Sequence, residues 1–189
     1  DDLVVQDTIS AGGDTTIGGT LSVAEDVTMD EDLSVGGNVM VEGTLSVNSD
    51  LTVDGDLSVS GNAQIEGNLN VTGDLSLDDL VVQDTISAGG DTTIGGTLSV
   101  AEDVTMSEDL SVGGNAMIQG TLSVTEDVTM SEDLSVGGNA MIEGTLSVNS
   151  DVTVDGDLSV SGNVQIDGNL SITGDLALDD LVVQDTISA

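Results

Sequence analysis

The chain has 189 residues, of which 36 are Asp or Glu and none is Lys, Arg or His, so its net charge is −36. Because phosphate groups are recognised by cationic side chains, this composition excludes nucleic acid and anionic membrane surfaces as partners. Pro, Cys and aromatic residues are also absent, and no apolar run is long enough to span a bilayer, so we predict no membrane insertion and no disulfides.

A six-residue unit begins at Gln6 and recurs along the chain. In "EGTLSV", residues 42–47, the fourth and sixth positions are aliphatic and the fifth is Ser. This alternation predicts a three-residue strand with one buried face. The other three residues are turn formers and predict a corner, because Gly tolerates positive φ and Asp or Asn can bond neighbouring backbone. Such short strands are stable only when stacked. The sequence therefore predicts an all-β fold, a β-solenoid (β-helix) of tandem six-residue strand-turn units.

The hexads run from Gln6 to Leu77 and from Gln83 to Leu178, so we expect 1–189 to be a single continuous repeat array. Five-residue units interrupt it at 1–5, 78–82 and 179–183, where "DDLVVQDTISA" begins. They divide the array into sub-repeats 1–77 and 78–178 and the start of a third copy, 179–189. We interpret the five residues as a loop that bulges from one corner or as a local change of twist, with a neutral insertion as the alternative.

A longer period of four hexads is superimposed on the single hexads. "EDLSVGGNAMIQGTLSV" begins at Glu108 and recurs with one change from Glu132. This spacing predicts a stacked column of small side chains that includes Ala63, Ala116 and Ala140. It also predicts one outward column holding Met40, Met117 and Met141. We therefore expect four hexads, about 24 residues, per coil. A coil of three hexads, about 18 residues, around a triangular section and an intertwined trimer are the alternatives, because gene duplication alone can create a longer period.

The units "GDLSVSGN" at 55–62 and "GNLNVTGD" at 67–74, with "GTLSV", resemble the shaft repeats of phage and virus tail-fibre or head-fibre proteins. They are also similar to the hexad-like repeats of bactofilins and other polymer-forming β-helices. The first resemblance implies a rigid spacer, often an intertwined trimer. The second implies a single-chain β-helix that polymerises end to end. The chain lacks the basic residues usual in bactofilins and the distal receptor-binding or chaperone module usual in fibres.

Carboxylates are the only candidate reactive groups. Glu-Asp pairs recur at corner positions, and coils stacked about 4.8 Å apart would align them in ladders. Ca²⁺ accepts 6–8 oxygen ligands flexibly, so it is the candidate cofactor, with diffuse counterions on a solvated surface as the alternative. The candidate metal ligands are Glu25, Asp26, Glu31, Asp32, Glu102, Asp103, Glu108, Asp109, Glu126, Asp127, Glu132 and Asp133.

Two further features of the sequence concern catalysis and modification. We predict no enzyme activity and no catalytic residues, because His, Cys and Lys are absent and the repeated carboxylates provide no single distinguished pair. The segments Asn70-Val71-Thr72 and Asn169-Leu170-Ser171 match the N-glycosylation sequon, although Asn-rich strands also produce such matches by chance.

The expected function is structural. We predict a fibre- or filament-forming repeat protein that serves as a rigid acidic shaft, extracellular, at the cell surface or in a virion. Its expected partners are divalent cations and copies of itself, as a homopolymer or homo-oligomer that includes the trimer. Repeats at both ends of the chain indicate a piece of a longer array or end-to-end stacking. The alternative is a calcium-dependent adhesin stalk or a module that binds a surface, a mineral or ice.

Overall fold

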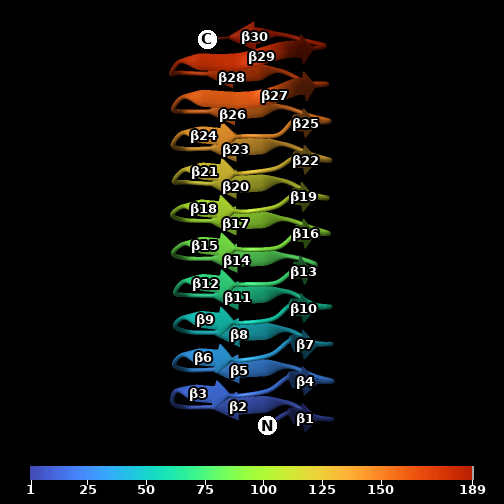
Figure 1. Cartoon of the computed structure of the whole chain (residues 1–189), viewed down its shortest axis with the longest axis vertical. Coiled ribbons are helices and arrows are strands. Elements are labelled where there is room, and N and C mark those ends of the chain that lie inside the picture. The colour runs from blue at the N-terminus through green and yellow to red at the C-terminus, as the bar shows by residue number, and fades with distance from the viewer. Residues whose placement is uncertain (189) are drawn as a thin grey trace.

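The computed structural model describes residues 1–188, which form an all-β parallel solenoid of about 10 turns with no helix in this range (Figure 1). Leu3 pairs with Leu21, and Leu21 pairs with Val39, so each turn contains three hexads, about 18 residues. The prediction of four hexads per coil is wrong, and the alternative of three hexads per coil is confirmed.

The three hexads of a turn give the solenoid three faces, and each face is a stack of parallel strands. Face 1 contains β1 (Leu3–Val5), β4 (Leu21–Val23), β7 (Val39–Val41), β10 (Leu57–Val59), β13 (Leu75–Leu77), β16 (Thr92–Ile94), β19 (Leu110–Val112), β22 (Val128–Met130) and β25 (Leu146–Val148). Face 2 contains β2 (Ile9–Ala11), β5 (Val27–Met29), β8 (Leu45–Val47), β11 (Ala63–Ile65), β14 (Leu80–Val82), β17 (Leu98–Val100), β20 (Ala116–Ile118), β23 (Leu134–Val136), β26 (Val152–Val154), β28 (Leu170–Ile172) and β30 (Ile187–Ser188).

Face 3 contains β3 (Thr15–Ile17), β6 (Leu33–Val35), β9 (Leu51–Val53), β12 (Leu69–Val71), β15 (Ile86–Ala88), β18 (Val104–Met106), β21 (Leu122–Val124) and β24 (Ala140–Ile142). Two longer strands, β27 (Leu158–Ile166) and β29 (Leu176–Val183), bend from face 3 to face 1 without a break. The corners between faces are named corner 1–2, corner 2–3 and corner 3–1.

Most strands place two aliphatic side chains inside and one polar side chain outside, although the outward residue is Met in β7, β20 and β24. In β10, Leu57 and Val59 are buried, and Ser58 faces outward because successive strand residues point to opposite sides. The inward side chains form one continuous core from Ile17 to Ile172. Thr92 is the exception in this core, and its hydroxyl donates a hydrogen bond to the sulfur of Met106 at 3.3 Å. The predicted burial of the aliphatic strand positions is thus confirmed.

The five-residue unit at 78–82 is an ordinary part of the solenoid. Its strand β14 stacks between β11 and β17, and Ala63 pairs with Leu80, one residue short of the usual spacing between turns. The unit therefore lacks one corner residue, and Asp78 and Asp79 alone make the turn. The prediction of a loop that bulges from the corner is wrong, because Leu80–Val82 keeps both neighbours and its inward side chains stay in the core.

The two columns predicted from the four-hexad period do not exist. Ala63 packs between Leu45 and Leu80, so its stacked neighbours are large. The three outward methionines lie on different faces, Met40 on face 1, Met117 on face 2 and Met141 on face 3. A step of four hexads is one turn plus one hexad, so it moves each repeated feature to the next face.

Corner carboxylates as the candidate functional site

In many corners the last residue is Asp or Asn, and its side chain connects its turn to the next one. In corner 1–2, the Oδ1 atom of Asp26 accepts a hydrogen bond from the backbone N–H of Thr44 at 2.9 Å, one turn later. In corner 2–3, Asp50 accepts the backbone N–H of Asn68 at 2.8 Å. In corner 3–1, Asp127 accepts the backbone N–H of Thr145 at 2.7 Å. These backbone donors would otherwise lack a protein partner, so the contact satisfies a corner that strand pairing does not reach.

The contact requires an oxygen acceptor but no charge. Asn38 accepts the backbone N–H of Asp56 at 3.0 Å, and Asn139 accepts that of Asp157 at 2.8 Å. Asp and Asn present the same short side chain with an oxygen in the same place, which explains why they alternate at this position. Many of the carboxylates therefore have a structural use that no bound ligand is needed to explain.

Close stacking at the corners explains the glycines. A Cβ atom on Gly43 would lie 2.3 Å from Oδ1 of Asp26, and one on Gly67 would lie 2.3 Å from Oδ1 of Asp50. No glycine among residues 1–188 has a positive φ. The expectation that glycine serves the turn through positive φ is wrong. At Gly43 and Gly67 its role is to leave room for the side-chain acceptor of the preceding turn, and at Gly61 it leaves room for the backbone of that turn.

The hydrogen bonds lower the pKa of several corner carboxyls. Thr145 donates its backbone N–H to Asp127, and its hydroxyl lowers the pKa of that carboxyl further below the ordinary value of 3.8. The hydroxyl of Ser150 and the backbone N–H of Asp151 lower the pKa of Asp133 in the same way. The pKa is lowered by the corresponding bonds at Asp2, Asp26, Asp32 and Asp103. Donation to the charged form favours ionisation, so these aspartates stay ionised under mildly acidic conditions.

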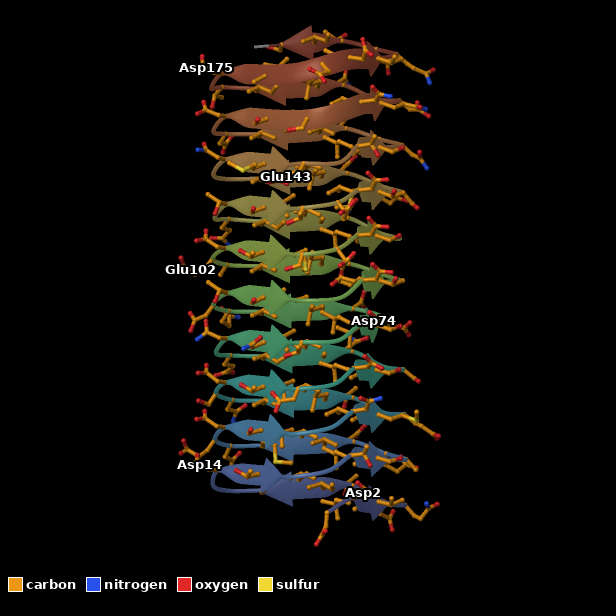
Figure 2. All side chains as sticks on the ribbon, in the orientation of Figure 1. Asp2, Asp14, Asp74, Glu102, Glu143 and Asp175 are labelled. Carbon is orange, nitrogen blue, oxygen red and sulfur yellow. The ribbon has the colours of Figure 1, made fainter. Side chains whose placement is uncertain are left out.

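The twelve predicted metal ligands lie at corners, as expected, but they are spread over all three. Pairs 25–26 and 132–133 lie in corner 1–2, pairs 31–32 and 102–103 in corner 2–3, and pairs 108–109 and 126–127 in corner 3–1. Only the last two pairs are one turn apart and stack on each other. Figure 2 shows the acidic side chains along the edges, with Asp14, Glu102 and Asp175 on corner 2–3 and Asp74 on corner 3–1.

The longest ladder was not among the predictions. Corner 3–1 carries an Asp at the same position in five successive turns, and each accepts the backbone N–H of the next, with Asp127 bonded to Thr145. Its members are Asp56, Asp74, Asp91, Asp109 and Asp127. The signal in the sequence is a stride of three hexads, shortened by one residue across the five-residue unit. A search at the four-hexad period misses it, because that step leads to another corner.

These ladders are not assembled into a metal centre in the described part of the chain. Residues 1–188 contain no group of three or more Asp or Glu side chains that could hold a metal ion. Each Asp of the ladder instead accepts, through one carboxylate oxygen, a hydrogen bond from a backbone N–H of the next turn. What the arrangement provides is a dense line of negative charge, which attracts cations from solution.

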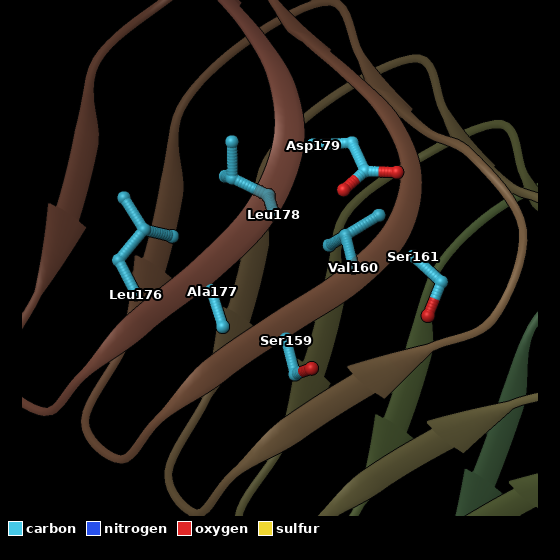
Figure 3. Close-up of a pocket in the computed structure, with 7 residues that line it drawn as sticks. All are labelled: Ser159, Val160, Ser161, Leu176, Ala177, Leu178 and Asp179. Atoms are coloured by element: carbon cyan, nitrogen blue, oxygen red, sulfur yellow. The ribbon is translucent and has the colours of Figure 1, made fainter.

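A surface hollow in the C-terminal part of the chain offers little chemistry. It has a volume of about 550 Å³ and lies where β27 and β29 bend from face 3 to face 1 (Figure 3). Its lining consists of Ser159, Val160, Ser161, Leu176, Ala177, Leu178 and Asp179. Asp179 is the one titratable side chain in this lining, so the hollow contains no acid–base pair.

Comparison with known proteins does not place the chain in a family. No protein-family model matches it, and neither a curated protein nor a solved structure shows significant similarity. Residues 1–188 contain no helix that is long and apolar enough to cross a membrane. The class of protein that the structure defines is therefore a parallel β-solenoid with acidic corners, with about 18 residues per turn.

Proposed function

We propose that the protein is a structural shaft, a rigid and acidic spacer located outside the cell, at its surface or in a virion. The observation that carries the proposal is the uninterrupted connection between turns. Strands pair on all three faces, corner side chains bond all three edges, and the core has no gap from Ile17 to Ile172. Bending or stretching such an object breaks many hydrogen bonds at once, which suits a mechanical role.

The repeats support stacking of one copy on another. The segment "DDLVVQDTISA" occurs at 1–11, 78–88 and 179–189, and its interior copy is paired with a turn on each side. The same sequence is thus compatible with neighbours in both directions along the axis. A second copy of the chain, stacked end to end, is the partner that we propose, as a homopolymer or homo-oligomer.

The surface charge supports a location rich in counterions. With 36 carboxylates on about 10 turns, each about 4.8 Å high, the chain carries roughly one negative charge per 1.3 Å of its axis. Duplex DNA carries one charge per ~1.7 Å and already condenses cations. Because no Lys or Arg offsets this charge, shafts of this protein repel one another and stay apart in solution.

A second candidate function is a calcium-dependent adhesin stalk, and the five-aspartate ladder on corner 3–1 favours it. Stacked carboxylates repel one another, and a divalent cation that bridges neighbouring turns would relieve that repulsion. In this version, Ca²⁺ stiffens the shaft and its removal loosens corner 3–1.

Electron cryomicroscopy of the protein in calcium, repeated after chelation, tests both candidates. Long threads with an axial repeat of about 4.8 Å in both conditions are expected for a shaft that stacks end to end. Threads that dissolve in chelator would favour the calcium-dependent stalk. Compact isolated particles in both conditions would contradict end-to-end stacking.

A further inference from the structure

The structure separates the two N-glycosylation sequons into different environments. Asn70 is the central residue of β12, and its side chain projects outward from face 3 and is exposed. Val71 is buried in the core, while Thr72, the hydroxyl residue of the sequon, is exposed on the surface again. The acceptor amide and the hydroxyl that the motif requires are therefore both accessible, and the residue between them anchors the strand.

The surroundings of Asn70 leave room for a bulky group. Its neighbours on the adjacent turns are Thr52 and Ser87, which are paired with it directly in the sheet. Both side chains are short, and both carry hydroxyl groups that can hydrogen-bond to a sugar. The outward residues one turn further away, Ser34 and Thr105, are also short. A sugar attached to Asn70 can lie along face 3 without displacing a side chain from the core.

The side chain of Asn70 also takes no part in the contacts between turns. Within residues 1–188 its side chain makes no hydrogen bond, in contrast to Asn68, whose side chain accepts hydrogen bonds from the backbone N–H and the hydroxyl of Thr85. Modification of the Asn70 amide therefore removes no contact that connects one turn to the next.

The second sequon is different. Asn169 lies in corner 1–2, and its side-chain amide donates a hydrogen bond to Asp151 at 3.1 Å, beside the backbone bond to the same oxygen at 2.7 Å. The atom that would carry the sugar thus points along the axis toward the preceding turn. A glycan there would crowd a corner where turns stack closely.

We propose that Asn70 is a site of N-linked glycosylation and that Asn169 is not. This proposal rests on the extracellular location proposed above, because the modification occurs in a secretory pathway. The chemical class of the group is an N-linked oligosaccharide, joined to the side-chain nitrogen of Asn70 and projecting from face 3.

The test is secretion of the full chain, with a cleavable leader, from a eukaryotic host that attaches N-glycans. Trypsin cannot cut a chain without Lys or Arg, but a protease specific for Glu cuts after Glu66, Glu102 and Glu143 and separates the sequons into 67–102 and 144–189. The mass of each fragment is then measured by mass spectrometry before and after enzymatic removal of N-glycans. We expect a glycan on 67–102 and none on 144–189.

Matched variants complete the test. Asn70→Gln and Thr72→Ala should each abolish the modification, and Asn169→Gln should leave it unchanged. Circular dichroism of the glycosylated and deglycosylated protein should show the same β-sheet content, since Asn70 has no structural contact to lose. An unmodified 67–102, or a glycan on 144–189 instead, would overturn the proposal. The added leader forces secretion, so that result would not bear on the shaft, which the microscopy judges separately.

Discussion

The contact between Asp127 and Thr145 predicts different effects for substitutions at two adjacent carboxylates. Asp127→Ala removes the acceptor of the Thr145 backbone N–H, at 2.7 Å in the structure. Glu126→Ala removes the same charge from the preceding position of the corner, where no such bond is formed. Asp127→Asn keeps the oxygen and removes the charge, as Asn139 does naturally in corner 2–3.

The expected effect of Asp127→Ala is the loss of a single exposed hydrogen bond. Such a bond contributes about 1 kcal/mol net, and that amount corresponds to about a fivefold change in an equilibrium constant. Because a repeat protein opens locally, the clearest measurement is the hydrogen exchange of the Thr145 amide rather than global unfolding. In Asp127→Ala we expect this amide to exchange about fivefold faster, while amides two turns away keep their rates.

Two control variants separate the loss of the hydrogen bond from the loss of charge. Glu126→Ala should leave the exchange of Thr145 unchanged or slow it slightly, because it only relieves repulsion in an acidic corner. Asp127→Asn should behave like the unmodified protein. If Glu126→Ala accelerates exchange as much as Asp127→Ala does, the effect comes from charge, and the structural role assigned to the corner oxygens is wrong.

Three further predictions concern pH, surface chemistry and the core. Hydrogen bonds lower the pKa of Asp127 below 3.8, so the stabilisation that this carboxylate provides is complete above pH 3.8 and is lost as the pH falls further. Protection of the Thr145 amide, corrected for intrinsic exchange, should therefore decline below pH 3.8. In Asp127→Asn it should not decline. Mild peroxide should oxidise the exposed methionines and spare the buried ones, which peptide mass spectrometry would show; equal oxidation of the two sets would contradict their inward and outward placement. The exposed set is Met40, Met117 and Met141, and the buried set is Met29, Met106 and Met130. Leu57→Ala should destabilise its turn by about 2–5 kcal/mol, since Leu57 is fully buried, whereas Ser58→Ala on the outer side should change stability by less than about 0.5 kcal/mol in chemical denaturation.

The strands could be predicted from the sequence, because the alternation that defines them is local. Leu57 and Val59 face inward and Ser58 faces outward, as the pattern indicates. The number of residues per turn could not be predicted in the same way. Almost every hexad offers two inward apolar residues, so any hexad can occupy any face, and the sequence alone does not show when the chain has closed a turn.

The prediction of the candidate site was limited by the same unknown, the number of residues per turn. Corner positions for the Glu-Asp pairs follow from the hexad, and all twelve residues do lie at corners. Which of them stack depends on the turn length, so the four-hexad step assigned Glu102 and Glu126 to one ladder although they lie in different corners. The hydrogen bond that each Asp accepts from the next turn could not be predicted either. It joins two residues one turn apart, and they can be paired only when the turn length is known.

The mismatch between the two periods has a consequence for function. A surface feature that repeats every four hexads on a turn of three advances by one face at each repeat, as Met117 on face 2 and Met141 on face 3 show. The same holds for the Glu-Asp pairs, which pass from corner 2–3 at Glu102 to corner 3–1 at Glu126. Features that repeat every four hexads therefore wind around the axis, whereas the Asp ladder, which repeats once per turn, stays on corner 3–1. A protein that binds a flat surface or a mineral needs its contacts aligned on one side. Winding instead distributes the exposed methionines and the Glu-Asp pairs over all three sides of the solenoid, which supports the shaft that we propose over the surface-binding alternative.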